Sequence, residues 1–157
     1  MQHTPVREWT LVILCSVVLA LTIPACAEQR RARGPEYTKI EVAHLIQRVE
    51  ESSDRFQQTF DRALDRSRLD GTRTEDRLNA QVQRLEQTIN ALREEFERRD
   101  SYRDLKGHVA QVLRQGDEVN SIMRSAQFPT PVEQQWAAMR TDLNRLADIY
   151  ALPVLRG

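Results

Sequence analysis

Cysteine and histidine are the side chains of this sequence best suited to nucleophilic or metal chemistry, and both are scarce. The two cysteines are Cys15 and Cys26, and the histidines outside the N-terminal region are His44 and His108. These two histidines fall early in predicted helices that would run in the same direction, so they could face each other and ligate haem or a metal ion. Both lie beside the apolar stripes of those helices, not within them. We therefore expect solvated histidines, with no metal and no cofactor.

Motifs of known catalytic sites are missing from the sequence. It contains no G-x-S-x-G nucleophile elbow, no glycine-rich phosphate loop and no H-E-x-x-H zinc motif. Neighbouring Asp and Glu residues are frequent, but they fall where predicted helices face solvent. We expect that the protein is not an enzyme.

The first 27 residues have the pattern of an export signal. Leu11 to Ile23 is an uncharged apolar run, which suits a signal peptide and is shorter than the about 20 residues that span a membrane. Ala25-Cys26-Ala27 is a small-x-small cleavage motif, so we expect the junction between Ala27 and Glu28 to be cut. The remaining chain would be periplasmic or secreted and would have no cysteine.

Two alternatives remain open for this segment. Ile23-Pro24-Ala25-Cys26 is similar to a bacterial lipobox, in which Cys26 would accept a lipid and anchor the protein facing the periplasm. Pro24 departs from that pattern, because a small or aliphatic residue is usual there. The arginines of 30–33 follow the apolar run, and basic residues tend to stay cytoplasmic, which favours an uncleaved anchor instead.

Composition indicates one helical domain after the signal. The 157 residues carry 23 basic and 23 acidic side chains, so no net charge attracts nucleic acid. Aromatic residues are only 6%, which is few for a β-sandwich. Arginine outnumbers lysine by 21 to 2, which could indicate contact with a polyanion. Acidic residues are interspersed with the arginines, so we favour a solvated surface of ion pairs.

Four apolar stripes with helical spacing follow a polar tether over residues 28–35. The first predicts a helix over 36–69, and Asp70-Gly71 then interrupts the pattern. The stripes are Val42, Ile46, Val49, Ser53, Phe56, Phe60 and Ala63; Leu78, Val82, Leu85, Ile89, Leu92 and Phe96; Leu105, Val109, Val112, Gly116, Val119, Met123 and Ala126; and Val132, Trp136, Met139, Leu143, Leu146 and Tyr150.

Two S/T-x-x-E motifs mark expected helix starts. Thr72 with Glu75 precedes the second stripe, and Thr130 with Glu133 precedes the fourth. In such a capping box each side chain satisfies a backbone N–H that the helix leaves unpaired. Pro153 is expected to stop the last helix.

Short connections between these helices predict an all-α, up-down-up-down antiparallel bundle over residues 36–157. The alternative is a three-helix hairpin in which the second and third segments fuse through Asp100-Ser101. At 1.5 Å per residue the first helix would be roughly 50 Å long and the last roughly 30 Å. Part of the first helix should therefore overhang the bundle or pack on a partner.

Ser53 and Gly116 are small residues within stripes of large ones. They fall at similar heights in their helices, so a ligand pocket could open between them. We favour the alternative that Trp136, at a comparable height on the last helix, fills this space.

Two stretches of the sequence resemble a class of small exported helical proteins of environmental bacteria. One is DRALDRSRLDGTRTEDRLNAQVQRLEQTINALREEF, from Asp61 to Phe96, and the other is WAAMRTDLNRLADIYAL, from Trp136 to Leu152. Together they cover about a third of the chain. The resemblance implies export and an all-helical fold, and it implies no activity, cofactor or functional residue.

These observations favour an exported helical bundle of the cell envelope with a structural or protein-interaction role. Its expected partner is an envelope protein, and contact with the membrane is expected only through the signal segment or a lipid anchor. The alternative is a periplasmic holdase-type chaperone that binds unfolded chains through an amphipathic face. Such a chaperone should expose Phe56, Phe60 or Phe96.

Overall fold

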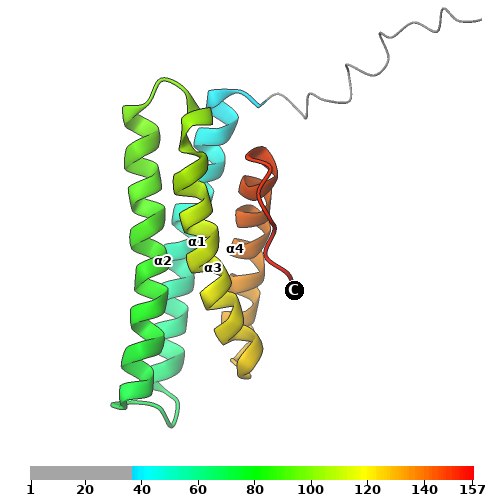
Figure 1. The fold of residues 1–157 in the computed structure, drawn as a ribbon. Helices are drawn as coiled ribbons and strands as arrows, with labels where there is room; N and C mark the ends of the chain where they lie inside the picture. Colours follow the sequence, from blue (N-terminus) through cyan, green and yellow to red (C-terminus); the bar gives the residue numbers. More distant parts are fainter. Residues whose placement is uncertain (1–36) are drawn as a thin grey trace, which may run out of the picture. The chain divides into compact units, whose positions relative to one another are not determined.

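In a computed structural model the chain is described from residue 37 to residue 157, and this part forms a bundle of four α-helices (Figure 1). Each helix packs against two others in the cyclic order of the chain, with the fourth closing on the first. The predicted all-α up-down-up-down bundle is therefore confirmed, with four separate helices. The elements are α1 (Lys39–Asp65), α2 (Arg73–Arg98), the 3-10 turn η1 (Tyr102–Leu105), α3 (Lys106–Ser125) and α4 (Thr130–Ile149).

The predicted signal segment and tether lie outside the described residues. Cys26, Ala27 and Glu28 belong to that part of the chain, so the predictions of cleavage and lipidation stay predictions. Among the four described helices, none is long and apolar enough to cross a membrane.

Helix α1 is shorter at both ends than its apolar stripe predicts. It begins at Lys39 because Thr38 and Glu41 form a capping box: Thr38 Oγ1 accepts from Glu41 N at 3.2 Å, and Glu41 Oε2 accepts from Thr38 N at 2.8 Å. It ends at Asp65, before the predicted Leu69. Beyond it, Ser67 Oγ accepts from Leu69 N at 3.0 Å, and this local hydrogen bond replaces a further helical turn.

The predicted cap of α2 is present in a modified form. Thr72 Oγ1 accepts from Glu75 N at 3.3 Å, as expected. The Glu75 carboxylate bonds Gly71 N at 2.7 Å, one residue before the cap. Gly71 has a φ of +70°, in the left-handed region that glycine tolerates best, and this conformation turns its N–H toward Glu75.

The predicted capping box of Thr130 and Glu133 is wrong. Helix α4 begins one residue earlier, with Pro129 as its N-cap and no side-chain cap. The carbonyl of Pro129 accepts from Val132 N at 2.9 Å and from Glu133 N at 3.3 Å. Because the Glu133 N–H is already bonded in this way, Thr130 has no donor left to cap.

The four stripes form the core, and they loosen toward the end of the bundle where α1 meets α2. Almost all of the stripe residues are buried. The exceptions are Ala63, Leu78 and Met123, which are half-buried, and Ala126, which is exposed. These four lie close to the α1–α2 turn or the α3–α4 loop.

The unequal helix lengths produce an overhang at that same end. At the opposite end Lys39 Nζ donates to Arg99 O at 2.7 Å, and Tyr150 OH donates to Tyr102 O at 2.8 Å, so that α1 is bonded to the end of α2 and α4 to η1. Helices α1 and α2 are about 40 Å long, against about 30 Å for α3 and α4. The α1–α2 turn therefore extends past the α3–α4 loop, as Figure 1 shows. Phe128 of that loop packs on Phe60, with ring centroids 5.2 Å apart.

The C-terminal tail, residues 152–157, folds back along α4 (Figure 1). Leu155 is buried, and a Cβ atom at Gly116 would lie only 3.1 Å from its Cδ1. The space at Gly116 is thus filled by Leu155 and not, as predicted, by Trp136. Trp136 instead packs on Phe56, with ring centroids 5.3 Å apart.

Candidate functional site

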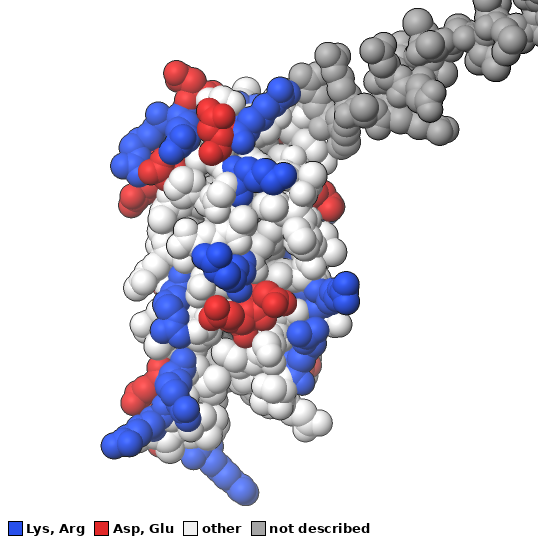
Figure 2. Space-filling view, viewed as in Figure 1, with Lys and Arg blue, Asp and Glu red and all other residues white. Residues whose placement is uncertain are grey.

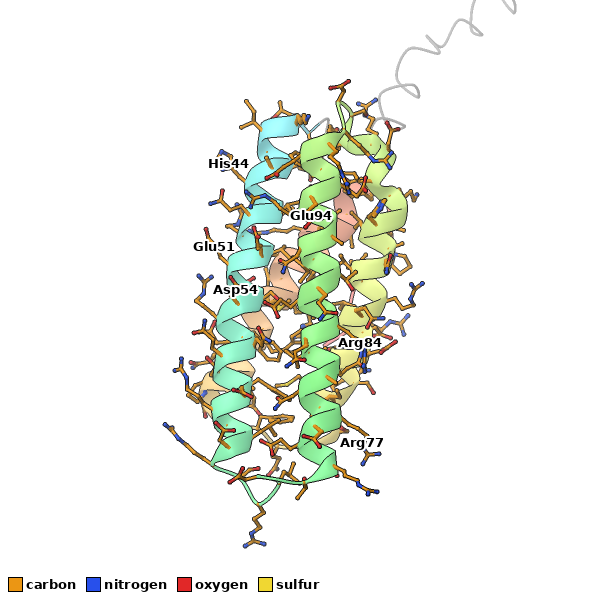
Figure 3. All side chains as sticks on the ribbon, turned by 90° about the vertical axis from the view of Figure 1, so that its left-hand side faces the viewer. His44, Glu51, Asp54, Arg77, Arg84 and Glu94 are labelled. Atoms are coloured by element: carbon orange, nitrogen blue, oxygen red, sulfur yellow. The ribbon has the colours of Figure 1, made fainter. Side chains whose placement is uncertain are left out.

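The two histidines that could have held a metal do not form a site. His44 is exposed, and Figure 3 shows it on the outer side of α1, away from the bundle interior. His108 is half-buried on α3. Within residues 37–157, neither histidine belongs to a group of side chains close enough together to share a metal ion.

The interior of the bundle has its polar groups satisfied. The buried polar side chains are Ser52, Ser53, Glu75, Gln81 and Asn120. Across residues 37–157, no buried side-chain nitrogen or oxygen lacks a hydrogen-bond partner. A polar group in the core that binds a substrate needs a free hydrogen-bond donor or acceptor. These side chains already form their hydrogen bonds within the protein.

Asn120 is the most buried of these groups, with none of its surface exposed. Its Oδ1 accepts from Trp136 Nε1 at 3.0 Å, and its Nδ2 donates to the carbonyl of Arg156 at 2.6 Å. One side chain therefore connects α3 to α4 and to the C-terminal tail. This arrangement explains why an amide is buried here, and it is a structural role.

The charged side chains pair locally over the surface. Figure 2 shows basic and acidic residues interspersed on the visible face, without a large patch of one sign. Arg93 joins α2 to α1 through Glu50, and Arg48 joins α1 to α4 through Asp142 at 3.6 Å. The expected ion-pair surface is therefore present, and Arg98 with Glu95 is another of its pairs.

A large hollow lies at the overhanging end of the bundle, and we call it the end groove. Its volume is about 870 Å³, within the 300–1,000 Å³ that is typical of ligand pockets. It is partly open to solvent. The last turns of α1, the α1–α2 turn, the start of α2, the end of α3, the α3–α4 loop and the start of α4 all contribute to its walls.

Apolar side chains form most of the end groove. Those that line it are Ala63, Leu64, Leu69, Leu78, Ile122, Ala126, Phe128, Pro129, Pro131 and Val132. Leu64 and Val132 are buried and form its floor, and Leu69, Leu78, Ile122 and Phe128 are half-buried at its sides. Because α1 and α2 extend past the α3–α4 loop, neither α3 nor α4 covers the apolar side chains at this end of α1 and α2.

The hydroxyl groups around the end groove are already bonded within the protein. Thr59 Oγ1 donates to Arg55 O at 2.8 Å, and Ser125 Oγ donates to Ile122 O at 2.9 Å. Ser67 Oγ accepts from Leu69 N. Gln127, which also lines the end groove, has an exposed polar side chain.

The charged residues that line the end groove are all arginines. Arg62 and Arg66 lie one helical turn apart at the end of α1, and no carboxylate lines the groove. Arg62 Nη2 contacts Gln58 Oε1 at 3.4 Å. Within residues 37–157, the guanidinium of Arg66 has no hydrogen-bond or ion-pair partner. The groove thus joins an apolar wall to two positive charges.

Three carboxylates gather at the nearby α1–α2 turn. Asp65, Asp70 and Glu75 each place one oxygen within 4.8 Å of the others, which is close enough to share a hard cation. Asp65 and Asp70 are exposed, and Glu75 is engaged by Gly71 N. Capping of α2 therefore accounts for the burial of Glu75, and no further observation indicates a metal ion.

The end groove was not predicted from the sequence, although some of its residues were singled out. Ala63, Leu78 and Ala126 were assigned to apolar stripes and expected in the core. The available signal was the difference in helix length, since the longer pair must leave apolar surface uncovered. At the positions considered for a pocket, Ser53 is buried and Leu155 packs on Gly116.

Comparisons with protein-family models, with curated proteins and with solved structures find no match to this chain. The resemblance of residues 61–96 and 136–152 to small exported helical proteins of environmental bacteria therefore stays a prediction.

Proposed function

We propose that the protein is an exported, non-catalytic helical bundle of the cell envelope with a structural or protein-interaction role. The observation that supports this most directly is the satisfied interior of residues 37–157, where every buried polar side-chain atom has a partner. Such a bundle acts through its surface. Its surface carries ion pairs between helices, such as Arg93 with Glu50 and Arg48 with Asp142.

The export part of the proposal rests on the N-terminal sequence. The uncharged run from Leu11 to Ile23 and the cleavage motif Ala25-Cys26-Ala27 support a periplasmic or secreted protein. A lipid on Cys26 would instead hold the same bundle at the membrane, with residues 28–35 as its tether.

The holdase alternative has less support. A chaperone that captures unfolded chains needs an exposed apolar face. Phe56 and Phe60 are 0% exposed and Phe96 is 7% exposed. In the described part of the chain the large hydrophobic residues that do face solvent are Ile40 and Val154, which are single side chains at separate places.

The intact mass of the protein from soluble and membrane fractions of an expressing bacterium tests the export proposal. A soluble chain that begins at Glu28 would support a free envelope protein, and a membrane-bound chain that begins at a lipidated Cys26 would support an anchored one. An uncleaved chain in the cytoplasm would contradict the proposal.

A second measurement separates the interaction role from the holdase. A purified chain of residues 28–157 should not suppress the aggregation of a heated model protein. Suppression at a stoichiometric ratio would favour the holdase instead.

A further inference from the structure

We propose that the end groove is a binding site for a free long-chain fatty acid, with the acyl chain along the apolar wall and the carboxylate between Arg62 and Arg66. This goes beyond the structural or protein-interaction role, which does not depend on it. No residue of the groove is needed for the satisfied interior on which that role rests.

The apolar wall has the composition that an acyl chain requires. Its lining side chains are aliphatic, proline or aromatic, and the hydroxyls of Thr59, Ser67 and Ser125 are bonded to backbone groups of the protein itself. A ligand in contact with this wall finds few free donors or acceptors. An extended peptide would therefore leave those of its N–H and C=O groups that face this wall unpaired, whereas a hydrocarbon chain has none to satisfy.

Charge complementarity indicates which end group the ligand has. Arg62 and Arg66 line the groove, no carboxylate does, and Arg66 has no partner within residues 37–157. The surface elsewhere pairs its arginines with acids, as Arg93 does with Glu50 and Glu97. Guanidinium groups one helical turn apart can both donate to one carboxylate, and such charge-assisted bonds are the strong ones.

The acidic residues of the same turn lie outside the lining of the groove. Asp65 and Asp70 belong to the carboxylate cluster with Glu75 and are absent from the groove lining. A cationic amphiphile would place its positive end group beside two arginines inside the groove. We therefore expect the groove to bind anionic amphiphiles and not cationic ones.

Binding is tested by titration calorimetry on a delipidated chain of residues 28–157, with dodecanoate below its micellar concentration. We expect saturable binding at one dodecanoate per chain and none of dodecylammonium. Equal binding of both amphiphiles, or no saturable binding of dodecanoate, would overturn the proposal.

Variants locate the site. We expect Arg62→Gln/Arg66→Gln to weaken dodecanoate binding by at least about tenfold, because two charge-assisted contacts are lost. The matched control Arg98→Gln/Arg99→Gln removes two arginines that pair with Glu95 at the opposite end, and it should bind as the parent does. Ala63→Phe should also weaken binding by filling the groove, provided that its circular dichroism and melting temperature show a folded bundle.

The same variants distinguish a free fatty acid from an anionic phospholipid in a membrane. Vesicles that contain anionic phospholipid should bind the chain no more strongly than neutral ones. If anionic vesicles bind in a manner that depends on Arg62 and Arg66 while free dodecanoate does not, the groove is a membrane contact and the fatty-acid proposal is wrong. The same holds if the control pair loses affinity as much as the groove pair, because binding is then nonspecific. None of these results bears on export, which the mass measurement tests separately.

Discussion

The side-chain amide of Asn144 pairs with both backbone polar groups of Leu155. Asn144 Oδ1 accepts from Leu155 N at 2.7 Å, and Asn144 Nδ2 donates to Leu155 O at 3.1 Å. A single residue of α4 thus holds the C-terminal tail much as a neighbouring β-strand would. This pairing positions the Leu155 side chain beside Gly116 and Leu143, where α3 and α4 would otherwise leave a gap.

We expect Asn144→Ala to lower the free energy of unfolding by about 1–3 kcal/mol, since two hydrogen bonds are lost. Deuterium exchange should increase most strongly over residues 152–157. Asn90→Ala is the matched control, because Asn90 is a half-buried helical asparagine whose side chain makes no hydrogen bond to another described residue. A similar increase in tail exchange for both variants would show that the amide pairing does not hold the tail.

Burial of Asn120 predicts a coupled pair of substitutions. Asn120→Ala leaves the Trp136 N–H unsatisfied in the core and should destabilise the chain by about 2–4 kcal/mol. In the background of Trp136→Phe the same substitution should cost less, because that N–H is no longer there. Urea unfolding followed by circular dichroism gives all four stabilities, and strictly additive losses would contradict the coupling.

The sequence predicted the fold well where the helical spacing of apolar residues was the only feature needed. The stripe of α4 illustrates this, because Val132, Met139 and Leu143 recur with helical spacing and are all buried. Helix ends were less predictable, since several local hydrogen bonds compete there. The same Glu133 N–H could have bonded Thr130 or Pro129, and in the structure it bonds the carbonyl of Pro129.

The tail and the end groove could not be predicted by periodicity. Leu155 follows Pro153 and Val154, in a segment too short to show a period. Its burial depends on Gly116 and Asn144, which lie far away in the sequence. The groove depends on how α1 and α2 are placed along α3 and α4, and contacts between residues far apart in the sequence, such as Tyr150 with Tyr102, contribute to that placement.

Two glycines with equally open surroundings should respond in opposite directions to alanine. No atom lies within 4 Å of a Cβ built at Gly71 or at Gly107. Gly71 has a φ of +70°, so Gly71→Ala should destabilise the chain by about 1 kcal/mol through backbone strain. Gly107 lies within α3, so Gly107→Ala should stabilise it by up to about 1 kcal/mol through helix propensity. Urea midpoints measure both, and shifts of the same sign would contradict this account of Gly71.

Glu86 should make the bundle less stable at neutral pH than it is under mildly acidic conditions. Burial, together with the nearby negative charge of Asp54, raises the pKa of Glu86 above its ordinary 4.5, and a hydrogen bond with Gln57 opposes this only in part. Because the folded-state pKa is the higher one, this group favours folding fully below about pH 4.5. That contribution is lost as the pH rises through the folded-state value.

Glu86→Gln should therefore stabilise the chain at pH 7, by at most about 0.5 kcal/mol because the site is partly solvated, and should have little effect at pH 3.5. Thermal unfolding at the two pH values measures the difference. Glu94→Gln is the control, since Glu94 is exposed on the same helix, as Figure 3 shows. A stabilisation by Glu86→Gln that is equal at both pH values would mean that shape, and not charge, is the cause.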